Sequence, residues 1–187
     1  MFRYPTRADT SEGYNLPHVK MEFGSHTGTK PNGIYTIISW VAEEFPDVFE
    51  SPEFKIVSLY AERTFWEKVT ILHAEYHRDK TSPMRMRLSR DLYDLYCMAE
   101  HELGKKALSN FDLLKEVVEH KQLYFFSARA KYEEVKPGTL CLVPPDFRLS
   151  ELESDYKKMK EMFTEDPPNF NELISKIKEI ENHINKS

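Results

Sequence analysis

The sequence predicts an α+β fold in which a short β unit precedes a helical bundle. Apolar and polar residues alternate at 18–23, and β-branched or aromatic residues dominate 33–40 and 54–59, which predicts strands. Beyond these, apolar residues recur at helical spacing. The chain has 187 residues, 40% of them hydrophobic, and this length fits one domain or one domain with a small appendage. We therefore divide it into a β unit at 1–60 and a helical bundle at 61–187.

Each strand of the β unit has its own signal. Alternation at 18–23 places Glu22 on the face opposite to the apolar side chains. A turn-rich GSHTGTKPNG segment separates this strand from the one at 33–40. The acidic segment 43–53 contains two prolines and is expected to be a solvated connection to the strand at 54–59.

The helices follow from apolar spacing and from capping residues. Thr64 with Glu67, Ser150 with Glu153, and Asn169 with Glu172 have the spacing of capping boxes. The proline-containing segment 136–147 is expected to be a loop. Five helices are expected, at about 64–76, 88–104, 110–126, 150–163 and 169–184.

Composition narrows the functional classes. There is no run of 18 apolar residues, so we expect no membrane-spanning helix. The two cysteines, Cys97 and Cys141, form no disulfide framework or Cys-x-x-Cys pair, which favours a reducing, cytoplasmic setting. Only six glycines are present, which argues against a glycine-rich phosphate loop.

Lys68 and Asp91 are the first candidates for a functional site. Each lies about 60° from the centre of the apolar stripe of its own helix, on the shoulder of a buried face. If the two helices pack through these stripes, the two charges can meet or line one cleft. The same placement also fits an interhelical salt bridge at the edge of the bundle, and the pattern alone favours that alternative.

Two further patterns have both a functional and a structural interpretation. The segment between these helices holds five basic residues offset only by Asp79, and it suits phosphate or RNA as well as an ordinary solvated loop. His73 and His77 lie four residues apart on one helix face, as in helical metal sites. No third ligand is apparent, and a structural or substrate-contact role is favoured. The basic residues are Arg78, Lys80, Arg85, Arg87 and Arg90.

Several ordered motifs resemble those of one protein family. They are VKMEFG at 19–24, RTFWEK at 63–68, LHAE at 72–75 and SRDLYD at 89–94, followed by GTL, LVP and DYxxM further along the chain. Together they are similar to the AbiEii/AbiGii family of nucleotidyltransferase-type toxins, found in abortive-infection and type IV toxin–antitoxin systems. The resemblance covers roughly residues 18–185.

The resemblance implies a partial polymerase-β-like nucleotidyltransferase sheet joined to a helical bundle. Such enzymes use Mg²⁺ or another divalent metal to transfer a nucleoside monophosphate from an NTP to an acceptor hydroxyl, with tRNA as one acceptor. By resemblance, Lys68 and Asp91 are catalytic: Lys68 holds the triphosphate and Asp91 is a base or polar organiser. Glu22 is a metal ligand. Phosphate or substrate contacts are implied for Arg63, Arg87, Arg90 and His73.

One family element has no counterpart here. The family places a Gly-Ser turn and an Asp-x-Asp pair before the strand that contains Glu22, whereas this sequence has no Asp-x-Asp. We therefore expect the chain to begin partway through the nucleotidyltransferase domain. A single Glu22 is a poor Mg²⁺ site, because the ion usually needs several anionic ligands. The alternative function is a non-catalytic remnant that binds nucleotide, RNA or a partner.

The expected partners follow from the same resemblance. They are an NTP, a tRNA acceptor and a cognate antitoxin. A partial sheet leaves strand edges exposed, which favours a homodimer.

Overall fold

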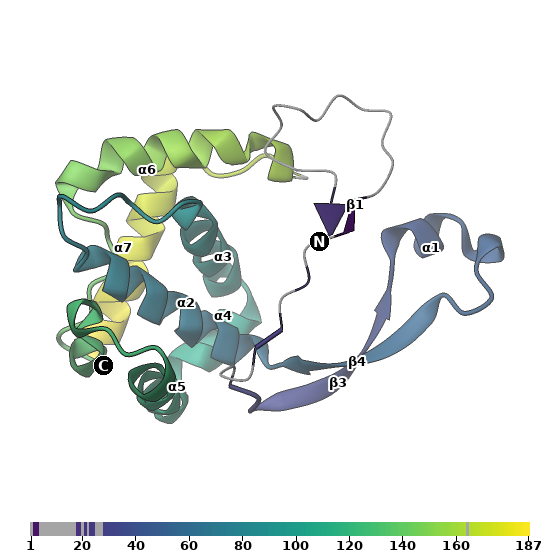
Figure 1. Cartoon of the computed structure of the whole chain (residues 1–187), viewed down its shortest axis with the longest axis horizontal. Coiled ribbons are helices and arrows are strands. Elements are labelled where there is room, and N and C mark those ends of the chain that lie inside the picture. The colour runs from purple at the N-terminus through teal and green to yellow at the C-terminus, as the bar shows by residue number, and fades with distance from the viewer. Residues whose placement is uncertain (1, 4–17, 20, 22, 25–27, 164) are drawn as a thin grey trace.

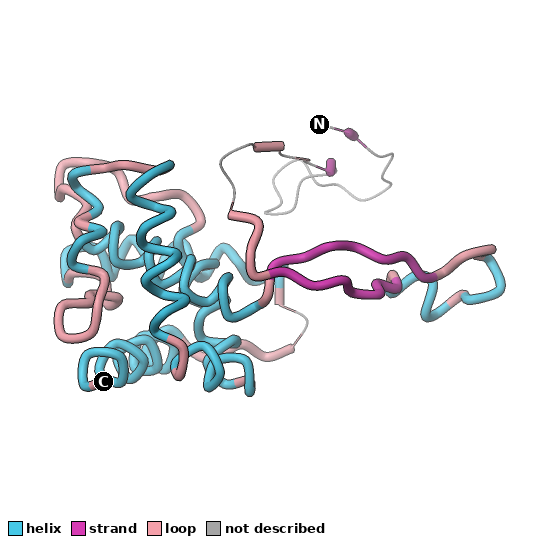
Figure 2. Tube along the Cα trace, turned by 90° about the horizontal axis from the view of Figure 1, so that it is seen from below, coloured by secondary structure: helices cyan, strands magenta, loops and turns pink. Residues whose placement is uncertain are grey.

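The computed structural model describes residues 2–3, 18–19, 21, 23–24, 28–163 and 165–187. A bundle of helices forms the body of the protein, and a two-stranded hairpin extends from one side of it (Figures 1 and 2). The chain is α+β, as the sequence predicts. No helix in the described part of the chain is long and apolar enough to cross a membrane.

The hairpin consists of β3 (Asn32–Ile38) and β4 (Glu53–Leu59), which pair antiparallel with Ile34 opposite Val57. Both lie where the sequence predicts strands. The connection between them is almost entirely exposed, as expected for a solvated segment at 43–53, and part of it is helical. It contains α1 (Trp40–Glu44) and a 3₁₀ turn (Pro46–Val48). The helix begins here because the Ser39 side chain accepts a hydrogen bond from the backbone N–H of Ala42.

The first predicted strand is shorter than expected among the described residues. There, β2 (His18–Val19) pairs antiparallel with β1 (Phe2–Arg3). The metal ligand expected from the resemblance, Glu22, lies outside the described residues. The two short pairings, β1 with β2 and β3 with β4, form separate sheets.

The core lies in the helical bundle, around α2 (Ala61–Tyr76) and α3 (Leu88–Glu100). Phe65, Trp66 and Val69 of α2 are completely buried. Their rings and methyl groups pack against α3 and the remaining helices, with Phe65 and Trp66 edge to face at 5.1 Å. Around them lie α4 (Glu102–Leu108), α5 (Phe111–Tyr124), α6 (Asp146–Lys158) and α7 (Phe170–Lys186), with 3₁₀ turns at Ala128–Ala130, Tyr132–Glu134 and Met159–Met162.

Two predicted helix starts are wrong, and one is confirmed. Thr64 lies inside α2, which begins three residues earlier, and Ser150 lies inside α6. Asn169 and Glu172 form the expected capping box at the start of α7. The helix predicted over 88–104 divides at His101, whose ring nitrogen Nδ1 accepts from the N–H of Leu103 and so starts α4.

A pair of side chains on α7 holds the loop predicted at 136–147. Glu181 and Asn185 are one helical turn apart on the same face. They accept hydrogen bonds from the backbone N–H groups of Gly138, Leu140, Leu142 and Val143 at 2.6–3.0 Å. A loop with no partner strand therefore has its backbone donors paired by side chains.

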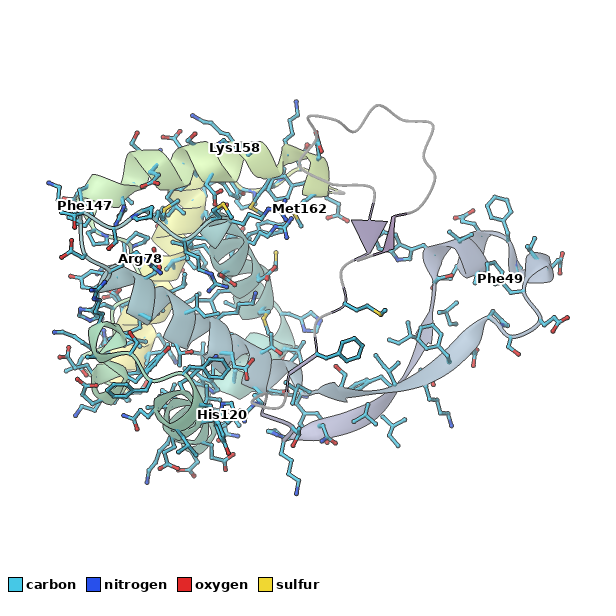
Figure 3. The ribbon with its side chains drawn as sticks, in the orientation of Figure 1. Phe49, Arg78, His120, Phe147, Lys158 and Met162 are labelled. Atoms are coloured by element: carbon cyan, nitrogen blue, oxygen red, sulfur yellow. The ribbon has the colours of Figure 1, made fainter. Side chains whose placement is uncertain are left out.

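The hairpin and the bundle differ in how far their apolar side chains are exposed. Phe49 lies at the far end of the hairpin, whereas Arg78, His120 and Phe147 lie on the bundle (Figure 3). Ile34 and Val57, neighbours across the hairpin, are 72% and 69% exposed. The hairpin thus leaves large apolar side chains in contact with solvent.

Candidate functional site

Lys68 and Asp91 meet at the junction of α2 and α3. Lys68 Nζ lies 2.7 Å from Asp91 Oδ1, and also 2.7 Å from Asp94 Oδ2. Asp91 and Asp94 are three residues apart on α3, so both carboxylates face α2 from the same side of the helix. The sequence-based placement of Lys68 and Asp91 on the shoulders of packed faces therefore leads to direct contact.

The other carboxylate oxygen of Asp91 faces a second cation. Arg85, in the connection between the two helices, places NH1 3.5 Å from Asp91 Oδ2. The side chain of Asp91 is only 9% exposed, whereas that of Asp94 is 47% exposed. Asp91 is thus held between two cations at the base of the site, and Asp94 lies at its rim.

The environment keeps Lys68 charged. Burial alone would lower the pKa of Lys68, but the hydrogen bonds and charges of Asp91 and Asp94 outweigh it, and the pKa is raised above its ordinary value. The ammonium is therefore a permanent positive charge at neutral pH. It can neutralise an anion, but it cannot accept a proton there.

These residues line an open cleft of about 460 Å³. Four cationic side chains and two carboxylates face it, so the described lining favours an anion. Met159, Met162 and Tyr93 give part of the wall an apolar character. The charged lining consists of Lys68, Arg85, Arg87, Arg90, Asp91 and Asp94.

The start of α3 adds to this positive character. Arg87 precedes the helix in a left-handed backbone conformation, with φ 61° and ψ 29°. Such a conformation costs a non-glycine residue about 1–2 kcal/mol, and strained residues concentrate at functional sites. Because α3 begins directly after Arg87, the positive end of its dipole lies beside Arg87, Arg90 and Asp91, which all line the cleft.

Not every site residue expected from the sequence reaches the cleft. Arg63 is buried, donates through NH1 to the Lys30 carbonyl at 2.6 Å, and pairs with Glu67 at 3.2 Å. The structure thus places Arg63 at the junction between the bundle and the segment before the hairpin, and not among the residues that line the cleft.

His73 also lies away from the cleft. Its ring is completely buried, and both ring nitrogens contact backbone groups of Lys131 and Cys141. The structure therefore gives His73 no access to a phosphate in the cleft. The basic residues at 78–90 do not all reach the cleft either. Arg78 is not part of the cleft lining and instead pairs with Glu75 at 2.7 Å.

The described cleft residues do not form a magnesium site. The carboxylates of Asp91 and Asp94 are both taken up by Lys68, and no third acidic side chain lines the cleft among the described residues. The donor set suits phosphate oxygens better than a hard cation.

Residues that the sequence reasoning missed complete the site. Asp94 is the last residue of the SRDLYD motif, and its spacing of three from Asp91 could have shown that both lie on one helix face. Met159 and Met162 come from a segment more than 60 residues away in sequence. No local pattern in the sequence links them to Lys68.

The fold and the cleft define an α+β protein with an anion-attracting cleft between two helices of a bundle. The sequence model of one family matches residues 1–176, almost the whole chain. The chain belongs to that family, the nucleotidyl transferase AbiEii toxins of type IV toxin–antitoxin systems. Comparisons with curated proteins and with solved structures gave no match. Membership implies an antitoxin as partner.

Proposed function

We propose that this protein is a toxin that transfers a nucleoside monophosphate from an NTP to an acceptor hydroxyl, with tRNA as acceptor. The observation that carries the proposal is the Lys68 ammonium held by Asp91 and Asp94 in a cleft lined by three arginines. Family membership supplies the reaction class. The cytoplasm is the proposed location, because NTPs and tRNA are found there.

Lys68 is proposed to bind the triphosphate. An ammonium group has three N–H donors, and the two carboxylates take two of them. The third is available to a phosphate oxygen without breaking either ion pair. Charge that grows on the phosphates during transfer is then stabilised by a cation already in position.

The three arginines are proposed to orient the phosphates. A planar guanidinium can bind two phosphate oxygens at once, which fixes direction as well as charge. Arg85 also contacts Asp91, with its NH1 3.5 Å from Asp91 Oδ2. Asp91 is therefore proposed as the organiser that spaces Lys68 and Arg85 around the substrate.

The apolar wall is proposed to receive the nucleoside. Met162 is 40% exposed and ends the 3₁₀ turn that follows α6 (Figure 3), and Tyr93 lines the same cleft. Aromatic and thioether groups both pack well against a base. Divalent metal remains part of the proposal through the family reaction. Its expected ligand, Glu22, lies outside the described residues, and we assign no cleft residue to it.

Label transfer tests the proposal directly. The full chain is incubated with each α-labelled NTP, Mg²⁺ and tRNA, and labelled RNA is resolved on a gel. Lys68→Met is expected to reduce transfer by about 10²–10³-fold, the usual effect of removing one group that stabilises transition-state charge. Lys105→Met is the matched control, because Lys105 pairs with Glu102 on the open surface. Equal activity of the Lys68 variant, the control and the wild type would contradict the assigned role.

A second candidate function is binding without catalysis. It is favoured by the absence of a magnesium site among the described cleft residues. It predicts that NTP or RNA binds in a salt-sensitive manner and that no label is transferred. Replacing Arg85, Arg87 and Arg90 together by Gln should then abolish binding. The homodimer expected from exposed strand edges is a separate proposal. Light scattering of the purified chain measures its mass in solution and so tests it.

A further inference from the structure

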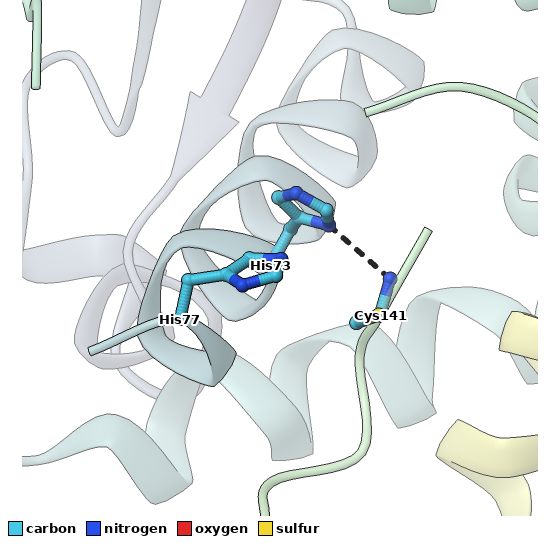
Figure 4. A group of neighbouring side chains, drawn as sticks. All are labelled: His73, His77 and Cys141. Atoms are coloured by element: carbon cyan, nitrogen blue, oxygen red, sulfur yellow. Dashed lines mark hydrogen bonds between the residues drawn. The ribbon is translucent and has the colours of Figure 1, made fainter. Parts of the chain in front are cut away.

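A second cluster of reactive side chains lies outside the cleft. His73 lies in the last turn of α2, His77 follows the helix directly, and Cys141 approaches both from the loop held by α7 (Figure 4). One ligand atom from each residue lies within 4.8 Å of the other two. None of the three lines the cleft. We propose that His73, His77 and Cys141 bind a zinc-type divalent metal ion that fastens this loop to α2.

His73 is already in the form that a metal ligand requires. Its Nδ1 accepts a hydrogen bond from the Cys141 N–H at 3.2 Å, so its lone pair is directed toward Cys141, and a metal ion bound to Nδ1 would take the place of this N–H. Its Nε2 lies 3.2 Å from the Lys131 carbonyl and donates to it. Histidines that bind metals usually hold their second nitrogen in this way, through a backbone carbonyl.

His77 supplies the observation that a packed protein interior does not explain. Its Nε2 is buried and has no hydrogen-bond partner within the described part of the chain. A buried, unpartnered polar atom is costly, and it points to a group that would occupy the space beside it. The Glu134 carboxylate, 3.9 Å from this nitrogen, adds negative charge that favours a cation.

Both imidazoles are neutral at physiological pH. Burial, with the neighbouring His77 and Lys131, lowers the pKa of His73 to about 4. Burial also lowers the pKa of His77. Neutral rings keep the lone pair that a metal needs.

Cys141 is held in place before any metal arrives. The backbone N–H groups on either side of it are bound by Asn185, through Leu140, and by Glu181, through Leu142. Burial raises the pKa of the Cys141 thiol, so the free side chain is protonated at neutral pH. Forming the Zn–S bond would break the S–H bond and release the proton to water. The fixed backbone leaves only the side-chain rotation to adjust.

The donor set selects the class of metal. Two imidazole nitrogens and one thiolate suit zinc, with a water in the fourth position, whereas magnesium prefers oxygen. Zinc bonds of 2.0–2.3 Å in a tetrahedron place ligand atoms about 3.4–3.6 Å apart. The present spread of up to 4.8 Å would close by about 1 Å, within reach of the side-chain torsions. Because none of these ligands belongs to the cleft, the proposal is independent of the nucleotidyltransferase activity.

Metal titration of the full chain tests the proposal. The reduced protein is stripped with a chelator and titrated with Zn²⁺ against a chromophoric competitor. We expect about one zinc ion per chain and a rise in Tm. Co²⁺ in place of Zn²⁺ is expected to give a thiolate-to-metal charge-transfer band, and excess Mg²⁺ should displace neither ion.

Variants locate the site. Cys141→Ser and His77→Gln should each weaken zinc binding at least tenfold, and Cys141→Ser should abolish the cobalt band. Cys97→Ser is the matched control, because Cys97 is the other free cysteine and lies on α3. Lys68→Met should leave zinc binding intact.

Three results would overturn the proposal. They are substoichiometric binding by the wild type, a wild-type cobalt spectrum without the thiolate band, and equal loss of affinity in the two cysteine variants. The first two need no variant, so they hold even if a substitution disturbs folding.

Discussion

Glu181 should contribute more to stability than any surface ion pair of this protein. Its side chain is 10% exposed, and its Oε2 accepts from the N–H groups of Leu142 at 2.6 Å and Val143 at 3.0 Å. A hydrogen bond to a charged group contributes about 1.5–3 kcal/mol, against about 0.5–1.5 kcal/mol for a neutral one. Glu181→Gln keeps the shape and removes the charge, so two bonds weaken by about 1 kcal/mol each.

The expected loss is therefore about 2 kcal/mol of unfolding free energy, or roughly 4–8 °C in Tm for a chain of this size. Urea unfolding followed by circular dichroism measures it. Lys178→Met is the control, because it removes only the exposed partner of Glu181, at 2.5 Å, and should cost less than about 1 kcal/mol. Equal losses in the two variants would show that the charge on the backbone bonds contributes nothing.

The contribution of Glu181 to the free energy of unfolding should also depend on pH. Burial alone would raise the pKa of Glu181, but the bonds from Lys178 and from the Leu142 and Val143 backbone outweigh it and lower the pKa. The unfolded chain then takes up the proton first as the pH falls. The stabilisation is complete above pH 4.5 and is lost as the pH falls through the lower, folded pKa, so the wild type and Glu181→Gln should converge in acid. A constant difference down to the lowest pH would refute the reasoning.

Three further predictions concern single contacts. The pKa of about 4 for buried His73 means that the folded state resists protonation, so about 3 kcal/mol of stability should be lost as the pH falls from 6.5 to 4. The urea midpoint of the wild type should fall as the pH is lowered across this range, and that of His73→Gln should change less. Asp155 accepts from both the N–H and the hydroxyl of buried Ser89, at 3.0 and 2.5 Å, and Asp155→Ala should cost about 2–3 kcal/mol because the N–H is orphaned. An unchanged urea midpoint would count against that bond. Gly104→Ala should lower Tm although alanine favours helices, because the new Cβ would lie 2.5 Å from backbone atoms of Met98 and Ala99. A raised Tm would mean that α4 can shift away.

The sequence was most informative where a pattern is local and repeated. Apolar spacing located the helices, and the shoulder positions of Lys68 and Asp91 anticipated their contact. The capping box at Asn169 was predicted because both its partners are close in sequence and its helix has one strongly apolar face. The same signal failed at Thr64, because packing of Phe65 and Trp66 continues α2 through that residue and makes a cap there unnecessary.

The rest of the two sites depends on contacts between distant segments. Cys141 lies beside His73 because α7 binds the backbone around it. The two residues are far apart in the sequence, so no local pattern predicts that they meet. Likewise, Arg63 is an arginine like those of the cleft, but from its position on α2 it binds the Lys30 carbonyl. The division into 1–60 and 61–187 stays a prediction.

The exposed hairpin has a consequence for how the molecule opens. Neither β3 nor β4 contributes a side chain to the hydrophobic core cluster of the described residues, which lies within the bundle. Its backbone hydrogen bonds can therefore break without disturbing that core. In deuterium exchange the amides of the hairpin should behave as one weakly protected unit, while those at the centre of α2 exchange only when the whole bundle unfolds.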